Sequence, residues 1–78
     1  MKLDLKIRLL RHFTGLDQQQ IAAKLHISVA DYSKIETGLL KANDAVFENM
    51  LAIFNLGREQ FSSWPDDKSK DLVKAYLA

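Results

Sequence analysis

The sequence lacks cysteine altogether, and its 78 residues include a single proline and three glycines. A chain without cysteine forms no disulfide and offers no thiolate for catalysis or metal binding, which fits a reducing compartment such as the cytoplasm. No apolar run approaches the roughly 20 residues of a membrane-spanning helix, and the charged start from Met1 to Lys6 lacks the apolar core of a signal peptide. We therefore expect a cytoplasmic protein without a membrane segment.

Low-complexity tracts and linkers rich in proline or glycine are also missing. Hydrophobic residues make up 47% of the chain and charged residues 27%, which is typical of a globular helical protein. A chain of this length forms one domain and buries only about 60–65% of its unfolded surface. Its margin of stability is therefore small, and dimerisation would increase it.

The sequence also lacks a strong excess of one charge. It has 11 basic and 10 acidic residues, which leaves a formal net charge of +1. Nucleic-acid-binding domains usually carry a basic face or are strongly basic overall, so the bulk charge gives little support to such a function. The basic surplus lies in the first 11 residues, which contain one acidic residue, Asp4, and four basic residues, Lys2, Lys6, Arg8 and Arg11.

Motifs for catalysis are missing as well. The chain has no glycine-rich phosphate loop, no His-x-x-x-His pair, no nucleophile elbow and no cluster of cysteine and histidine. His12 has no second ligand at metal-binding spacing, and the neighbouring carboxylates of Asp66 and Asp67 fit the first turn of a helix. We expect no enzymatic activity, no metal site and no cofactor.

The segment from residue 17 to residue 38 has the pattern of two short helices joined by a tight turn. Asp17 is a good N-cap with Gln20 at capping-box spacing, and Ser28 with Asp31 repeats this spacing at the second helix. Gly38 is placed to end that helix. The apolar stripes have helical spacing and consist of Ile21, Ala22 and Leu25, then Tyr32 and Ile35.

This segment resembles the helix-turn-helix of the lambda-repressor-like DNA-binding domains, the family of phage repressors, Cro and xenobiotic-response-element proteins. The similarity covers roughly residues 5–61 without a gap. Within the segment it rests on Gln18, Ala22, Leu25, Ile27, Ser28, Tyr32, Ile35, Glu36 and Gly38. On either side it extends to Ile7, Leu10, Arg11, Gly15 and Leu16, and to Phe47, Met50, Leu51, Phe54 and Leu56.

The resemblance implies an all-α fold with a five-helix DNA-binding domain over residues 1–62. Beyond the extent of the family, the pattern of residues 63–78 predicts an additional amphipathic C-terminal helix. It also implies an ion pair between Arg11 and Glu36 that ties the first helix to the recognition helix. The alternative for these two residues is a pair of solvated charges worth under about 1 kcal/mol.

The remaining helices follow from local patterns. We expect a first helix over residues 4–14, a fourth helix capped by Asn43 and a short fifth helix over residues 58–61. Ser63 and Asp66 stand at capping-box spacing, which predicts a last helix over residues 65–77.

The first helix carries a second apolar stripe that a five-helix domain leaves uncovered. We expect the C-terminal helix to cover it, either in the same subunit or in a dimer partner, with Trp64 as an anchor near the hinge. The residues concerned are Leu9 and Phe13 on the first helix, and Trp64, Leu72, Val73 and Tyr76 in the C-terminal segment. The competing interpretation is a membrane-surface helix, which the nearly balanced charge of its polar face disfavours.

The family resemblance also assigns the contacts to double-stranded DNA. The base-facing positions are Val29, Ala30, Asp31 and Lys34. The expected phosphate contacts are Gln18, Thr37 and Lys41.

Two functions therefore stay open. The first is a sequence-specific transcriptional regulator that binds DNA as a homodimer. Its direct readout should be poor, because Lys34 is the one obvious donor to a base edge and Asp31 is equally well explained as a helix-start residue beside Ser28. The alternative is a protein-interaction module, such as an antitoxin or the partner of a larger regulator, for which the unusual leucines Leu39 and Leu40 would serve as a surface.

Overall fold

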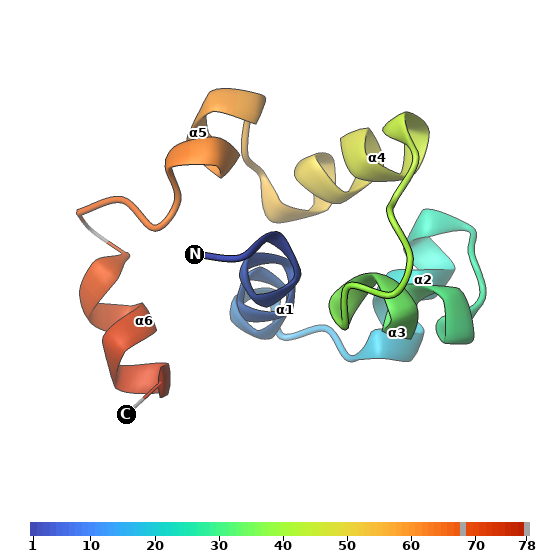
Figure 1. Ribbon diagram of the computed structural model, residues 1–78, viewed down its shortest axis with the longest axis horizontal. Helices are drawn as coiled ribbons and strands as arrows, with labels where there is room; N and C mark the ends of the chain where they lie inside the picture. Colours follow the sequence, from blue (N-terminus) through green and yellow to red (C-terminus); the bar gives the residue numbers. More distant parts are fainter. Residues whose placement is uncertain (68, 78) are drawn as a thin grey trace.

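The computed structural model describes residues 1–67 and 69–77, which form an all-α fold (Figure 1). Within these residues there are helices and connecting turns but no strand, so the predicted fold class is confirmed. The helices are α1 (Leu3–Thr14), α2 (Gln18–Leu25), α3 (Val29–Glu36), α4 (Asp44–Phe54), α5 (Arg58–Ser63) and α6 (Lys70–Leu77). In the described part of the chain, no helix is both long and apolar enough to cross a membrane.

Helix α1 occupies the middle of the molecule, with the pair α2 and α3 on one side and α6 on the other (Figure 1). It packs against α3 and α4, while α2 packs against α3 and α4. The helix-turn-helix is therefore held from behind by α1 and α4. This arrangement leaves one side of α3 free for a partner.

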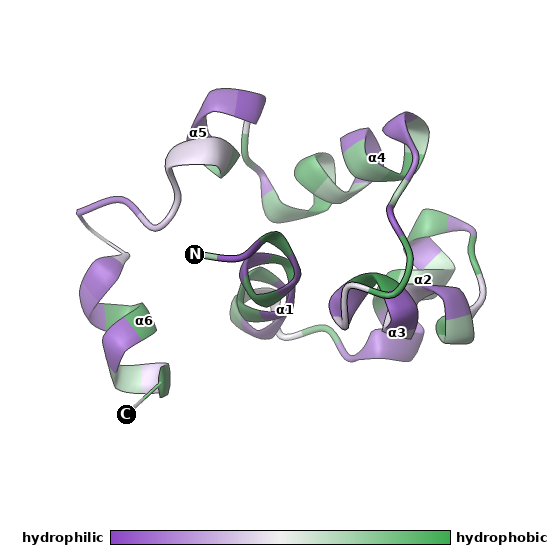
Figure 2. Ribbon diagram, in the orientation of Figure 1, coloured by the Kyte–Doolittle hydropathy of each residue, from purple (hydrophilic) through white to green (hydrophobic). Residues whose placement is uncertain are grey.

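The core is made by the inward stripes of the helices, which appear as hydrophobic faces turned toward the centre (Figure 2). Its largest fully buried side chains are Tyr32, Leu9, Ile21 and Met50. Burial of such apolar surface supplies about 25 cal/mol per Å², which makes this cluster the main source of stability.

The predicted caps are largely present. Asp17 accepts from the backbone N–H of Gln20, whose side chain accepts from the N–H of Asp17, so the first capping box is complete. Asn43 accepts from the N–H of Val46 at the start of α4. Gly38 has φ +80°, the left-handed conformation that favours glycine after a helix end.

The turn between α2 and α3 is formed at His26, which adopts the left-handed conformation with φ 58°. The N–H of Ile27 donates to the carbonyl oxygen of Ala22 at 3.1 Å, which closes α2 as the chain reverses. Ser28 then caps α3 by accepting from the N–H of Asp31. The turn made by His26, Ile27 and Ser28 therefore sets the angle between α2 and α3.

The start of the last helix differs from the prediction. Helix α6 begins at Lys70, not at residue 65, and Ser63 does not cap it. Ser63 instead belongs to α5, where its hydroxyl donates to the carbonyl oxygen of Glu59 at 3.0 Å. The prediction places Asp66 at the third position of the last helix. In the structure its carboxylate accepts from the N–H of Ser69 at 2.8 Å, so Asp66 caps the turn that precedes α6.

Candidate nucleic-acid interface

The buried carboxylate of Glu36 joins the helices of the helix-turn-helix to α1. Its Oε2 accepts from the Nε of Arg11 and from the hydroxyl of Tyr32, the latter at 2.7 Å. Its Oε1 accepts from the amide of Gln18 at 2.9 Å and from Arg11 Nη2 at 3.3 Å. Arg11 also donates through Nη1 to the carbonyl oxygen of Leu16 at 3.0 Å. The ion pair predicted between Arg11 and Glu36 is present, within a larger network.

The charges in this network are well defined at neutral pH. Burial alone would raise the pKa of Glu36, but the hydrogen bonds from Arg11, Tyr32 and Gln18 outweigh it and hold the pKa below its ordinary value of 4.5. Burial, followed by the hydrogen bond to Glu36, raises the pKa of Tyr32. Glu36 is therefore ionised and Tyr32 is a neutral donor to it, so α1, α2 and α3 are fixed relative to one another.

The face of α3 opposite this network points outward. All four predicted base-facing residues, Val29, Ala30, Asp31 and Lys34, are exposed. Tyr32, Ile35 and Glu36 occupy the buried side of the same helix. Ala30 and Lys34 lie one helical turn apart on the side opposite Tyr32, while Val29 and Asp31 are exposed in the first turn, on either side of that pair. That these four residues face DNA bases stays a prediction.

Asp31 is not explained by helix capping alone. Its backbone N–H donates to Ser28 Oγ at 3.0 Å, but α3 has no reciprocal bond from the Asp31 side chain to the Ser28 backbone. Among residues 1–67 and 69–77, the carboxylate of Asp31 has no hydrogen-bond or ion-pair partner. Its negative charge is therefore available at the surface of α3.

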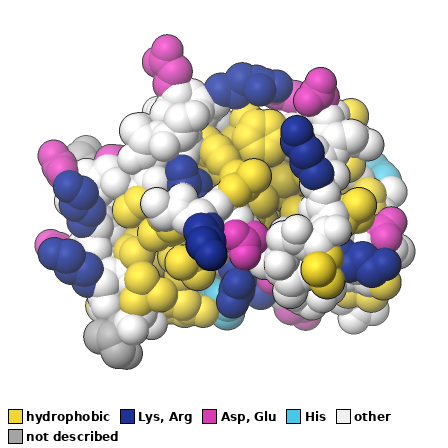
Figure 3. All heavy atoms as spheres, in the orientation of Figure 1, with side chains coloured by type: hydrophobic (Ala, Val, Ile, Leu, Met, Phe, Trp, Pro, Cys, Tyr) yellow, Lys and Arg dark blue, Asp and Glu magenta, His cyan; other side chains and the backbone are white. Residues whose placement is uncertain are grey.

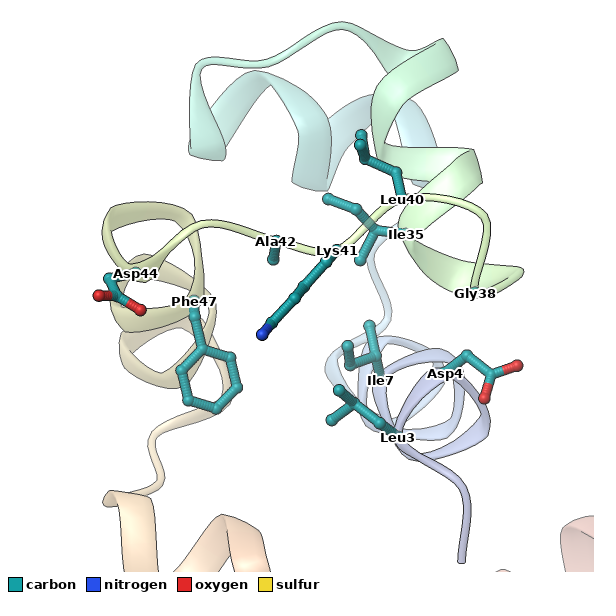
Figure 4. A pocket seen from close by; sticks show the side chains of 10 residues that line it. All are labelled: Leu3, Asp4, Ile7, Ile35, Gly38, Leu40, Lys41, Ala42, Asp44 and Phe47. Carbon is teal, nitrogen blue, oxygen red and sulfur yellow. The ribbon is translucent and has the colours of Figure 1, made fainter.

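The side chains of the three predicted phosphate-contacting residues lie in three different environments. The amide of Gln18 is engaged by Glu36, as described above. The hydroxyl of Thr37 donates within its own helix, to the carbonyl oxygens of Ser33 and Lys34 at 3.2 Å. Lys41 is exposed, and its amino group extends between α1 and α4 (Figure 4). The structure does not gather these three groups into one anion site.

Much of the basic surplus at the N-terminus is withdrawn from the surface. Lys6 is buried, and its Nζ donates to the carbonyl oxygens of Phe61 at 2.8 Å and Ser62 at 3.2 Å, near the end of α5. Burial lowers the pKa of Lys6. Arg11 is engaged by Glu36, so Lys2 and Arg8 are the N-terminal basic residues whose side chains stay exposed.

Sequence reasoning missed the role of Lys6, although a signal was present. Lys6 lies on α1 three residues before Leu9 and four before Leu10, both of which are buried. On a helix such residues share one face, which here is the face toward the core. A lysine on that face has its charge satisfied by buried acceptors, here the carbonyl groups at the end of α5.

A second exposed surface lies where α1 meets α6 in the same chain. Tyr76 packs against His12 with 5.1 Å between ring centroids, and against Phe13 with 6.3 Å. Trp64 meets Phe13 edge-on at 6.0 Å and is buried. The aromatic side chains of α6 and its hinge therefore cover the end of α1 within one subunit.

This cover is incomplete. Leu9 is fully buried and Val73 is 5% exposed, whereas Phe13 stays 44% exposed and Leu72 61% exposed. Tyr76 is also nearly half exposed. The six predicted cover residues thus divide into a buried group and an apolar patch formed by Phe13, Leu72 and Tyr76, which we call the α1–α6 patch.

Within the described ranges, no group of three or more histidine or acidic side chains could hold a metal ion. In the comparisons with known proteins, a family described as "Helix-turn-helix domain" matches residues 5–64. No curated protein and no solved structure matches the chain. The family match spans α1 to α5 and ends at Trp64, just before the turn that leads into α6.

Proposed function

The chain belongs to the helix-turn-helix domain family, and from that premise we propose that it binds double-stranded DNA as a transcriptional regulator of the lambda-repressor-like type. In this proposal α3 lies in the major groove and α2 crosses the backbone beside it. The observation that carries it is the division of α3: Tyr32 and Glu36 are fixed on the inner side, while Lys34 on the opposite side and the first-turn residues Val29 and Asp31 are exposed. A rigid helix with one free face is what docking in a groove requires.

The exposed residues define what this helix would read. Lys34 is the donor to guanine O6 or N7, and Asp31 can accept from cytosine N4. Val29 offers apolar contact to a thymine methyl group. With the Gln18 amide held by Glu36, a phosphate at the start of α2 would be bound by the free backbone N–H groups of its first turn.

The charge of the interface predicts weak binding by a single subunit. With about two or three phosphates neutralised per subunit, log K falls with log salt at a slope of about −2 to −3. We propose that specific binding needs a homodimer that presents two α3 helices to successive major-groove segments, about 34 Å apart. The α1–α6 patch is the surface proposed for this dimer, because its apolar side chains are exposed in one subunit.

The test for DNA binding is a selection from random duplex oligonucleotides at low salt, followed by titration of the recovered site. Lys34→Ala should weaken binding by about fivefold to 150-fold and relax the preference at one base pair. Lys74→Ala on α6 is the matched control, since it removes an exposed lysine far from α3 (Figure 1). Recovery of no enriched site, with residual affinity unchanged by Lys34→Ala, would rule out the proposal.

The test for the dimer is sedimentation velocity with Leu72→Glu. Leu72 is exposed, so a charge there should leave the subunit folded and shift the chain from dimer to monomer. Leu39→Glu is the control, because Leu39 is more exposed still and lies outside the patch. A wild-type chain that sediments as a monomer at every concentration would contradict the dimer proposal.

One observation favours the alternative function, a protein-interaction module. The first turn of α3 presents Val29, which is 47% exposed, and Asp31, whose carboxylate has no partner among the residues that the structure describes. An apolar and acidic surface suits a basic protein partner, whereas DNA phosphates repel its carboxylate. A purified partner whose binding is lost in Val29→Ser, from a chain with no measurable DNA affinity, would favour this function over the first.

We also propose that the chain has no catalytic activity. The hydroxyl groups of Ser28 and Ser63 are used by the backbone, as the cap of α3 and as a donor to Glu59. His12 packs against Tyr76 at the surface, with no nucleophile described beside it. A purified wild-type chain should accordingly show no hydrolysis of generic ester or phosphoester substrates above the buffer rate.

A further inference from the structure

The structure contains an apolar cavity away from the outer face of α3. It has a volume of about 340 Å³ and lies between the first half of α1, the end of α3 with its following loop, and α4 (Figure 4). Its walls are mainly the side chains of Leu3, Ile7, Ile35, Leu40 and Phe47. Figure 3 shows hydrophobic side chains at the bottom of a hollow in this part of the molecule. The volume falls within the range of about 300–1,000 Å³ that is usual for small-molecule sites.

One charged group extends into this cavity. The side chain of Lys41 crosses it from the loop and ends between Phe47 and α1, whereas the carboxylates of Asp4 and Asp44 point away (Figure 4). Among residues 1–67 and 69–77, the amino group of Lys41 has no hydrogen-bond or ion-pair partner. The cavity therefore combines apolar walls with a single unpaired positive charge.

From this combination we infer that the cavity binds a small amphipathic monocarboxylate. The apolar part of the ligand lies against Ile7, Ile35 and Phe47, and its carboxylate accepts a charge-assisted hydrogen bond from Lys41 Nζ. A cationic ligand is repelled by the same amino group. A phosphodiester has too little apolar surface to fill the walls, so this is a site distinct from the DNA-binding surface.

The position of the site connects it to DNA binding, and this consequence rests on the proposed function. Ile35 is part of α3, and Lys41 is one of the predicted phosphate contacts. The amino group of Lys41 lies in the cavity, so it reaches a phosphate only when the side chain turns outward. A carboxylate that holds Lys41 in the cavity therefore competes with this phosphate contact. Bound ligand then lowers DNA affinity and reduces the salt slope by about 1.

Ligand binding is tested without DNA, so that its outcome does not depend on the proposed function. The probes are octanoate and 3-phenylpropionate, with octanol and octylammonium as matched uncharged and cationic ligands. Titration followed by amide chemical shifts should show saturable binding of one or both carboxylates, with the largest shifts at Ile7, Leu40 and Phe47. Octanol should bind about tenfold or more weakly than octanoate, and octylammonium should not bind.

The variants separate the charge from the walls. Lys41→Ala should reduce octanoate affinity to that of octanol, about tenfold or more, while Lys41→Arg keeps most of it. Lys24→Ala is the control, since Lys24 is exposed on α2 and does not line the cavity. Leu40→Ser should weaken octanoate and octanol alike, because it shortens an apolar wall.

Four results of the probe titrations would overturn the inference. They are the absence of saturable carboxylate binding, equal affinity for octanoate and octanol, unchanged octanoate affinity in Lys41→Ala, and shifts confined to the α1–α6 patch. Concentration-dependent shifts at Leu40 and Phe47 without any probe would show that a second copy of the chain fills the cavity, which also overturns it. The relative preference for the two carboxylates distinguishes an aliphatic ligand from an aromatic one.

Discussion

Replacing Arg11 by methionine tests whether the network around Glu36 holds the helix-turn-helix together. Methionine keeps an unbranched apolar side chain of similar length but removes the guanidinium. Glu36 is 2% exposed, so its carboxylate would stay buried without its cationic partner. The hydrogen bonds from Gln18 and Tyr32 would remain. The variant therefore removes the charge interaction with Glu36 and the hydrogen bond to the Leu16 carbonyl oxygen, while the apolar packing of the side chain is kept.

The expected loss can be bounded. Removing one partner of a buried ion pair costs about 3–5 kcal/mol, and the two remaining hydrogen bonds place this case at the lower end, at about 3 kcal/mol. A chain of 78 residues has a free energy of unfolding of about 4–12 kcal/mol. Arg11→Met should thus remove a large fraction of the stability, which urea denaturation followed by circular dichroism at about pH 7 would measure.

The loss should depend on pH in a defined direction. In the wild type the pKa of Glu36 is lowered below 4.5, so the ionised carboxylate stabilises the fold above that pH, and this contribution is lost as the pH falls through the lowered pKa. In Arg11→Met, burial acts without the guanidinium and shifts the pKa of Glu36 upward. The difference in unfolding free energy between the two proteins should accordingly be largest near neutral pH and shrink at about pH 3.5.

Two further variants make this prediction decisive. Arg58→Met removes one partner of the ion pair with Glu48, in which both side chains are more than half exposed, and should cost under about 1 kcal/mol at any pH. Glu36→Gln in the Arg11→Met background removes the buried charge and should recover part of the lost stability. If Arg11→Met costs no more than Arg58→Met, or if its cost is the same at both pH values, the network does not hold the helices as argued.

The remaining predictions concern other parts of the fold. Lys6→Met should cost about 1–3 kcal/mol in urea denaturation, because the carbonyl oxygens it binds at the end of α5 lose their donor; an unchanged midpoint would contradict this. Gly38→Ala should cost about 1–2 kcal/mol, since φ is +80° there while the new Cβ has ordinary space, and Gly38→Asn should cost less. Val73→Asp should abolish the hydrogen-exchange protection of α6, whereas the same change at the exposed neighbour Leu72 should preserve it.

The helix boundaries that depend on neighbouring residues could be predicted from the sequence. Asp17 with Gln20, Ser28, Gly38 and Asn43 all act where the local pattern places them. Capping is a contact between a side chain and a backbone group three residues away, so the tertiary fold has little opportunity to change it. The exposed positions of α3 follow from its predicted start at Ser28, because the helical period then determines which side chains point away from the core.

The C-terminal segment shows where local patterns fail. Ser63 and Asp66 have capping-box spacing, but the Ser63 hydroxyl binds a carbonyl group of α5 instead. Serine can bond to a backbone group on either side of it, and the choice depends on which helix its own backbone joins. The burial of Phe61 beside Lys6 extends α5 to Ser63, and α6 can therefore begin only after another turn.

The predicted interface contacts also depend on tertiary structure. The sequence shows four basic residues near the N-terminus, and the family resemblance predicts the ion pair of Arg11 with Glu36, but nothing in the sequence shows that Lys6 binds carbonyl groups at the end of α5. It likewise does not show that Gln18 donates to Glu36. Each of these contacts joins residues far apart in the chain, and the period of one helix gives no information about the acceptors on another.

The position of the α1–α6 patch constrains how a dimer could present its recognition helices. Helix α6 lies across α1 from α3 (Figure 1), and the chain measures 32 Å along its longest axis. Two copies joined end to end at α6 would hold their α3 helices farther apart than the roughly 34 Å of one turn of B-DNA. Half-sites about 10 base pairs apart then require the two copies to be inclined toward the DNA. Twice the 32 Å length of the chain is less than the roughly 68 Å of 20 base pairs, so even an extended dimer does not reach that spacing. The spacing in a selected binding site therefore reports on the dimer, and half-sites about 20 base pairs apart would exclude the α1–α6 patch as its interface.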